Sequence, residues 1–281
     1  MLLEESRIRK QALKYGIYRL SESTDCTQQT RKGLSMNNVI FLPHHRRIIA
    51  VLFGIIGGAL DVYCQLKFGT LVALQTGNII FLISDIQYGN MEGVAIRCLS
   101  VLFFTLGFWT GMIVERWEKT PYWRAWNICP FLVVTLILPV ISCHAIVWVA
   151  LLAYTAGIVM ISFRGIQIES EPYSLFMTSG NYQRMLISWY HHWRHDYKHD
   201  KMKRQAVNYS IMVSSFVAGA LIAAAFVHLF DTYAVWFIAI CTFVVLSKYA
   251  GDVRALEQAK KKAKQGHRSC KQEQIIKKEF D

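Results

Sequence analysis

Long apolar runs alternate with short polar stretches along most of this chain. A helix that crosses a bilayer needs about 20 consecutive apolar residues, and six runs reach or approach that length. The pattern therefore predicts an all-α, polytopic membrane protein with about six transmembrane helices. The predicted spans are residues 48–66, 95–114, 127–142, 144–163, 206–227 and 232–249.

Two further apolar stretches are interrupted by polar residues. Residues 69–83 contain Thr-Gly-Asn at 76–78, and residues 173–190 contain Ser-Gly-Asn at 179–181. As a helix, the first stretch would reach only about 22 Å, which is too short for a comfortable lipid-facing span. We expect both stretches to dip into the membrane and return on the same side.

The distribution of basic residues orients the prediction. The first 47 and the last 34 residues hold 9 and 10 of the 31 Lys and Arg, which predicts two cytoplasmic termini and an even number of crossings. Six crossings would leave only two basic residues outside, Lys67 and Arg97. Eight crossings, the open alternative, would leave five outside: Lys67, Arg116, Lys119, Arg124 and Arg164. The charge rule favours six.

Composition supports a membrane as the main partner. Hydrophobic residues make up 53% of the chain and charged residues 18%, against about 25% charged in soluble domains. The net charge is +12, but the basic residues flank apolar runs, so we expect no nucleic acid as a partner. We predict a multi-pass protein of the cell (plasma or inner) membrane with three parts. These are a basic cytoplasmic extension (1–47), a transmembrane domain (48–249) and a basic cytoplasmic tail (250–281) that meets anionic lipid headgroups.

The two halves of the transmembrane domain resemble each other. A shift of 103 residues places Gly54 on Gly157 and the first Gly-Asn pair on the second. Three crossings and one dip in each half predict an inverted-topology repeat, an architecture of many transporters. Each half also has a small-x-x-x-small pattern, expected to pack between helices or protomers. Its residues are Gly107, Gly111, Gly219 and Ala223.

The two Gly-Asn motifs are the best candidates for a binding site. Irregular backbone at membrane depth is tolerated only where protein or a water-filled cavity satisfies it. Asn, Thr and Ser are good helix N-caps, and a half-helix start attracts anions and dipoles. Asp61 joins the candidates because it is the only acidic residue well inside an apolar span. The predicted solute-binding residues are Thr76, Gly77, Asn78, Ser179, Gly180, Asn181 and Asp61; the alternative is that both motifs are packing kinks.

At these residues the chain resembles the YoaK family, bacterial multi-pass membrane proteins classed as a domain of unknown function. The resemblance rests on Gly58-Ala59-Leu60-Asp61 followed by Thr76-Gly77-Asn78, and on Gly157, Arg164 and Ser179-Gly180-Asn181 in the second half. The family's Gln-Asn pair is replaced here by Val159-Met160. The resemblance covers about residues 48–249. It implies a membrane location with six or so spans and no established activity.

A histidine-rich stretch offers a different chemistry. On a helix, His191, His195 and His199 would share one face, as zinc or copper ligands do, although a solvated interfacial segment explains them as well. We expect no enzyme and no cofactor. The leading hypothesis is a small transporter or channel-like permease for a small polar or anionic solute. The alternatives are a non-transporting assembly or scaffold protein, with a homo-oligomer as partner, and, least favoured, a metal-dependent membrane enzyme.

Overall fold

Helices account for nearly all of the regular structure, which confirms the all-α prediction. The computed structural model describes residues 17–18, 40–41, 47–117, 120–141, 143–164, 167–168, 171–176, 178–194 and 199–280. Within these ranges, strands occur only as two short antiparallel pairs. They are β1 (Ile17–Tyr18) with β2 (Ile40–Phe41), and β3 (Gln167–Ile168) with β4 (Glu171–Pro172).

The chain divides into two units. Arg47–Ala250 is the compact helical unit, and it contains Asp61 and both Gly-Asn motifs. The other unit holds both ends of the chain, Met1–Arg46 and Gly251–Asp281, and its described part is the β1–β2 pair and the end of the last helix.

The helices follow the predicted apolar runs, and the two interrupted stretches become short helices. In chain order they are α3 (Arg47–Phe68), α4 (Gln75–Tyr88), α5 (Met91–Trp117), α6 (Trp123–Ile137), α7 (Ala145–Ser162), α8 (Thr178–Trp193), α9 (His199–Phe230), the 3-10 turn η2 (Asp231–Ala234) and α10 (Val235–Phe280). Glycines with a left-handed backbone follow α3 and α4, namely Gly69 (φ 67°) and Gly89 (φ 69°). Glycine adopts this conformation without steric cost, so both helices stop there.

Four helical stretches are long and apolar enough to cross a membrane. They are Arg47–Phe68, Met91–Trp117, Ala145–Ser162 and Lys201–Ala259. The last is folded at η2 into α9 and α10, and α6 is a shorter apolar helix of 15 residues. With 14 and 16 residues, α4 and α8 fall below the usual spanning length.

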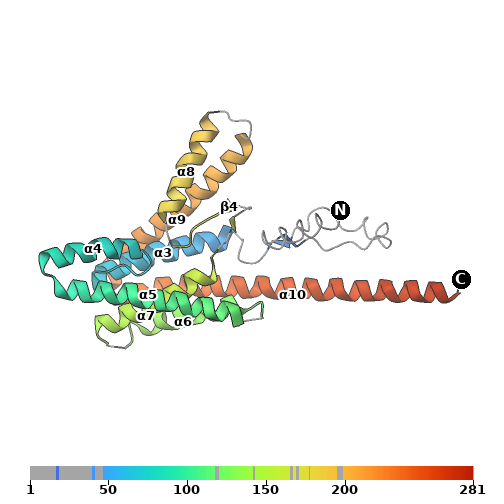
Figure 1. The fold of residues 1–281 in the computed structure, drawn as a ribbon, viewed down its shortest axis with the longest axis horizontal. Helices are drawn as coiled ribbons and strands as arrows, with labels where there is room; N and C mark the ends of the chain where they lie inside the picture. The colour runs from blue at the N-terminus through green and yellow to red at the C-terminus, as the bar shows by residue number, and fades with distance from the viewer. Residues whose placement is uncertain are drawn as a thin grey trace. The chain divides into compact units, whose positions relative to one another are not determined.

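Each short helix folds back along its successor, α4 along α5 and α8 along α9 (Figure 1). The long helices pair across the two halves of the sequence instead. The first long helix of each half packs against the third element of the other half, α3 on α9 and α7 on α5. The core of the unit lies along these two pairs, where α3 and α7 bury most of their residues.

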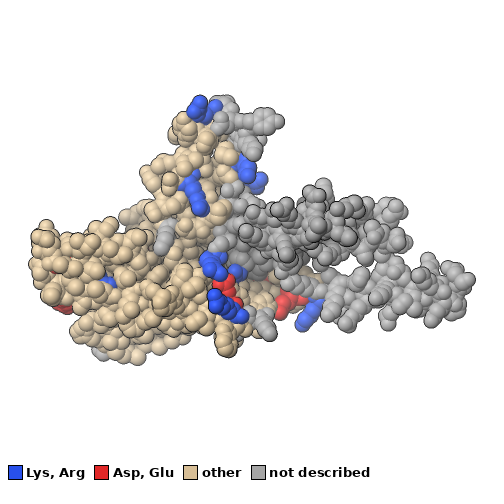
Figure 2. Space-filling view, viewed as in Figure 1, with Lys and Arg blue, Asp and Glu red and all other residues tan. Residues whose placement is uncertain are grey.

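Polar contacts fix which helix ends lie together. At one end, Lys67 bonds Asp231 at 2.6 Å and Trp236 donates to the carbonyl of Leu136. At the other end, Arg164 pairs with Glu115 at 3.0 Å and Tyr249 donates to the carbonyl of Pro121. Because α10 runs from Trp236 to Tyr249 between these groups, they mark opposite ends of the helical unit. Figure 2 shows the side of the α4–α7 region in this view almost free of charge, with Lys, Arg, Asp and Glu near the end of α5 and further Lys and Arg over α8 and α9.

Candidate functional site

The first loop, residues 69–74, connects α3 to α4 and is held by a buried carboxylate on α3. Asp61 Oδ1 accepts hydrogen bonds from the backbone N–H groups of Val72 (3.0 Å) and Ala73 (2.8 Å). Asp61 is only 3% exposed, and its Oδ2 has no hydrogen-bond partner among the residues that the structure describes. The loop backbone is therefore satisfied by a side chain, as buried backbone must be.

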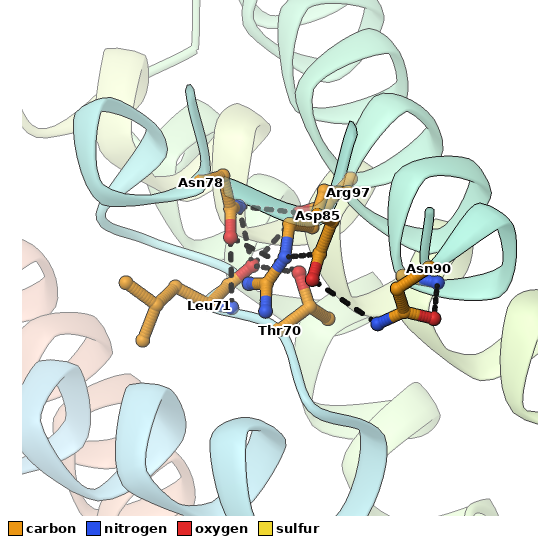
Figure 3. Close-up of polar contacts among 8 residues, drawn as sticks. Thr70, Leu71, Asn78, Asp85, Asn90 and Arg97 are labelled. Carbon is orange, nitrogen blue, oxygen red and sulfur yellow. Dashed lines mark hydrogen bonds and ion pairs between the residues drawn. The ribbon is translucent and has the colours of Figure 1, made fainter. Parts of the chain in front are cut away.

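Asn78 of α4 holds the same loop from the other side. Its Oδ1 accepts from the N–H of Leu71 (3.0 Å) and the hydroxyl of Thr70 (3.0 Å). Its Nδ2 donates to the carbonyl of Leu71 (2.7 Å) and to Ser100 Oγ of α5 (3.1 Å), and Ser100 in turn donates to Leu71 (2.8 Å). Figure 3 shows Asn78 facing Thr70 and Leu71 in this way. Both polar atoms of the Asn78 amide are thus fully hydrogen-bonded within the protein.

The second loop, residues 173–176, precedes α8 and is pinned by Asn181 with the same pairing. Asn181 Oδ1 accepts from the N–H of Ser174 and its Nδ2 donates to the carbonyl of Ser174, both at 3.0 Å. Leu71 and Ser174 are 103 residues apart, as are Asn78 and Asn181. The same Asn–backbone pairing therefore occurs twice, at the 103-residue spacing found by comparing the two halves of the sequence.

The tip of the second loop packs against α3 through a glycine. A Cβ on Gly57 would lie 2.9 Å from the Cα of Phe176, closer than real Cβ contacts come. Phe176 also has a left-handed backbone (φ 57°), which is rare for an aromatic residue and marks a strained position. The ring of Phe176 lies 5.9 Å from that of Phe53, which in turn lies 4.7 Å from that of Phe163. An aromatic cluster thus holds this tip.

Both loop tips reach the same helix, one turn apart. The first loop bonds to Asp61 and the second rests on Gly57, and residues four apart share one face of a helix, about 6 Å from each other along its axis. The two motifs are 103 residues apart in the chain, so it is the fold that brings both loops to this stretch of α3.

The predicted capping role of the two Asn side chains is wrong for α4. The N-cap of α4 is Leu74, which makes no side-chain capping bond, and Asn78 lies inside the helix. For α8 the preceding residue lies outside the described part of the chain, and Asn181 is the fourth residue of the helix. Each Asn bonds to the backbone seven residues before it instead. The sequence pointed to Asn78 and Asn181 but predicted bonds to the helix start, because capping is a local pattern. The bonds that they make run across a loop to the backbone of Leu71 and Ser174.

The remaining motif residues flank the loops. Thr76 and Ser179 are exposed, and Gly77 and Gly180 are partly exposed. A Cβ on Gly77 would lie 2.6 Å from Leu71 Cδ1, so the end of the Leu71 side chain would have to move to accommodate a larger residue. At Gly180 the nearest atom would be Ser174 Oγ at 3.5 Å, an ordinary contact.

An ion pair stands beside the first loop. Arg97 Nε of α5 bonds Asp85 Oδ2 at 2.6 Å, and Asn90 donates to the other oxygen of the same carboxylate at 3.1 Å (Figure 3). The hydrogen bond from Arg97 lowers the pKa of Asp85, which lies in the last turn of α4, outside the helices long enough to span. The Arg97 guanidinium also lies 4.8 Å from the centre of the Phe81 ring. Sequence reasoning named Arg97 only as an outlier of the charge rule.

The small-residue faces are used inside the chain. A Cβ on Gly107 would overlap the carbonyl of Tyr154, and one on Gly157 would overlap that of Phe104, which closes the α5–α7 crossing. In the α3–α9 crossing, Gly58 meets the carbonyl of Phe216 and Gly219 meets that of Ile55. Gly111 abuts Ile158 and Ile161 of α7, and Ala223 is buried.

The two crossings correspond residue by residue. Gly58 and Ile55 precede Gly157 and Tyr154 by 99 residues, and Phe104 and Gly107 precede Phe216 and Gly219 by 112. Gly58 therefore takes the place that the sequence comparison gave to Gly54, which faces Ser215 instead.

The histidine stretch is described only in part. His191 lies on α8 with its ring 5.7 Å from that of Tyr190. His195 lies outside the described residues, and of His199 only the backbone is described, as the start of α9. Among the side chains that are described, no three His, Cys, Asp or Glu come together as metal ligands would. Metal binding by this stretch was the less favoured alternative to a solvated segment, and it stays untested.

Comparison with known proteins gives one match. The family described as protein of unknown function, DUF1275, matches residues 49–247, which is most of the chain and nearly all of the helical unit. No curated protein and no solved structure matches the chain. The YoaK resemblance stays a prediction. The matched range includes both loops, Asp61 and both glycine crossings. Because the match covers well over half of its length, the chain belongs to the DUF1275 family.

Proposed function

We propose that this protein is a small permease that carries a small polar or anionic solute across the cell membrane. One observation carries the proposal: two loops of irregular backbone, pinned by the same Asn pairing, contact α3 one turn apart inside an apolar helical unit. Irregular backbone at membrane depth is tolerated only where protein or a water-filled cavity satisfies it, so it is uncommon in helices that serve only to cross the membrane. Transporters commonly place their site where two such interrupted segments meet.

The proposed topology has six crossings, by α3, α5, α6, α7, α9 and α10, with both termini in the cytoplasm. The helix-end contacts support it. Lys67 lies with Asp231 at one end, while Tyr249, near Pro121, lies at the other. The two loops then enter from opposite faces, the first after the outward α3 and the second after the inward α7. The matched glycine crossings support an inverted repeat, in which each half supplies one loop.

The proposed solute meets the starts of α4 and α8. Helix starts carry partial positive charge and bind anions and dipoles, and the exposed hydroxyls of Thr76 and Ser179 lie in those first turns. Asn78 and Asn181 act as positioning residues, since they bond the loop backbone. Gly77 leaves room for the Leu71 side chain beside the start of α4.

The contacts argue against the scaffold alternative in its simplest form. A scaffold that assembles through the small-residue faces needs those faces free, yet Gly107, Gly111 and Gly219 contact helices of the same chain. The exposed apolar side chains that remain are those expected of any lipid-facing helix.

Sided labelling tests the proposed pathway. In a variant whose native cysteines are all replaced by alanine, Thr76→Cys should react with a membrane-impermeant thiol reagent from the face that carries Lys67. Ser179→Cys should react only from the opposite face. Leu221→Cys is the matched control, because Leu221 is 67% exposed near the middle of α9 and should lie in lipid and stay unreactive.

Flux measurements test transport itself. The purified chain in sealed vesicles is assayed with two probes, chloride by quenching of a trapped dye and urea by light scattering. We expect at least one probe to cross faster than in protein-free vesicles, and the large adduct on Thr76→Cys to slow it. Unreactive cysteines at both positions together with no flux above background would refute the permease.

A further inference from the structure

We propose that Asp61 binds a proton reversibly at Oδ2, and that its protonation state decides how tightly the first loop is held. The binding of the proton stands on the geometry of Asp61 alone. Its coupling to solute movement rests on the proposed permease function.

The two oxygens of Asp61 are in different situations. Oδ1 accepts two backbone N–H groups of the first loop, and Oδ2 has no hydrogen-bond partner in the described part of the protein. The residue is 3% exposed on a helix long enough to span a membrane. A buried carboxylate with one unsatisfied oxygen is costly as an anion, and a proton on that oxygen removes the charge.

A proton fits this place better than a metal cation does. Metal cations of the alkali and alkaline-earth groups need several oxygen ligands. The groups directed at Asp61 are amide N–H donors from Val72 and Ala73, which repel a cation. The described residues also contain no cluster of three His, Cys, Asp or Glu.

No cationic side chain is in a position to neutralise Asp61 from the packed helices. α7 contains no charged residue, and α9 contains none from Ala206 to Val227. From Val235 to Ser247 of α10 the only titratable residue is Cys241, and on α3 the titratable neighbours are Tyr63 and Cys64. From α5, Arg97 is already bonded to Asp85 of α4. The second loop contributes the neutral side chain of Phe176, which faces Gly57.

Protonation changes the hold on the loop. With Asp61 charged, the bonds to Val72 and Ala73 are charge-assisted, and such bonds are roughly twice as strong as neutral ones. The proton comes from water, adds to Oδ2 and leaves a neutral carboxylic acid, so both bonds weaken together. The coupling is reciprocal. If protonation of Asp61 favours release of the loop by a certain factor, release of the loop raises the proton affinity of Asp61 by the same factor. Protonation and loop release are thus one coupled event.

The test measures loop accessibility against pH. In the variant without native cysteines, Ala73→Cys is labelled with an impermeant thiol reagent, and each rate is divided by that of Tyr88→Cys, which corrects for the titration of the thiol. Tyr88 is 84% exposed at the end of α4. We expect the corrected rate to rise about tenfold as pH falls, the factor that two weakened bonds would give. In Asp61→Asn it should be high and independent of pH. A pH dependence that survives in Asp61→Asn, or none in the parent, would overturn the proposal.

Infrared spectroscopy of the full chain, with its natural cysteines, provides a second measurement that needs no introduced cysteine. Aspartate labelled with ¹³C in the side chain shows a carboxylic-acid band that should appear as pH falls in detergent. Mass spectrometry and thermal unfolding show whether Asp61→Asn is intact for the matching spectrum, where the band of the buried acid should be missing. A titrating band without any solute flux would refute the permease and leave the proton site standing. Solute flux without a titrating band would refute the proton site and leave the permease standing.

Discussion

The first and second loops are held by the same Asn–backbone pairing but differ in the other contacts that fix them. In both, an Asn pairs its amide with the N–H and carbonyl of the residue seven positions earlier. The first loop is then fixed by polar groups, Asp61 and Ser100, whereas the second is fixed by Phe176 resting on a glycine. One loop is thus sensitive to charge and the other to shape. Two loops with the same Asn pairing are thus held by different surrounding contacts.

The largest expected effect comes from removing the shared Asn in each loop. Asn78→Ala leaves the N–H and carbonyl of Leu71 short of partners, and we expect a loss of roughly 3 kcal/mol. Asn181→Ala should cost less, roughly 2 kcal/mol, because Ser174 is half-buried near the start of α8. Thermal unfolding in detergent measures both. Equal losses would mean that the polar surroundings of the first loop add nothing to its hold.

The next effect tests the shape-dependent loop alone. Gly57→Ala places a Cβ 2.9 Å from the Cα of Phe176, so the second loop must shift, at a cost of about 1–3 kcal/mol. Gly251→Ala is the matched control, since a Cβ there meets nothing within 4 Å and alanine favours a helix by about 1 kcal/mol. Proteolysis between α7 and α8 should become faster in Gly57→Ala only. Unchanged cleavage would show that Phe176 does not depend on this contact.

A smaller effect tests the charge-sensitive loop. Ser100→Ala removes one donor to Leu71 and one acceptor of Asn78, while the Asn78 pairing with the backbone survives. We expect a loss of about 1 kcal/mol, which brings the first loop to the level of the second. Unfolding of the single variants and of Ser100→Ala with Asn78→Ala measures the coupling. Simple additivity would contradict a shared network.

The smallest effect lies at the helix ends. Lys67→Ala breaks an ion pair whose Asp231 side chain is 74% exposed, so we expect at most about 1 kcal/mol. High salt should reduce the difference between parent and variant, because screening weakens exposed pairs. A loss that persists in high salt would mean that Lys67 acts through packing.

Much of the fold follows from the sequence because its signals are local. Apolar run length predicted the apolar part of every long helix, although α10 continues to Phe280, well beyond the predicted end at residue 249. The Thr-Gly-Asn and Ser-Gly-Asn motifs marked the breaks that became the starts of α4 and α8. The charge rule and the spacing of motifs predicted a topology that the helix-end contacts support.

The site was predicted in composition but not in geometry. Asp61 and both Asn residues were named, yet their partners lie across a loop, and no local rule relates Asp61 to Val72 and Ala73. Phe176 carried no signal, because an aromatic residue in an apolar run is ordinary until its backbone angle is known. Gly58 was overlooked because a glycine reveals a close crossing only when the facing helix is in place.

The glycine crossings have a consequence for how the chain is made. Gly58 of α3 meets Phe216 of α9, so this contact forms only after 158 further residues have been synthesised. α5 finds its partner α7 much sooner. In a nascent chain that has not yet produced α9, the glycine face of α3 therefore has no partner helix, although Asp61 can already bond to the first loop. We expect insertion machinery or a membrane chaperone to bind such a helix until α9 has been made. A chain truncated before α9 should be inserted but quickly degraded.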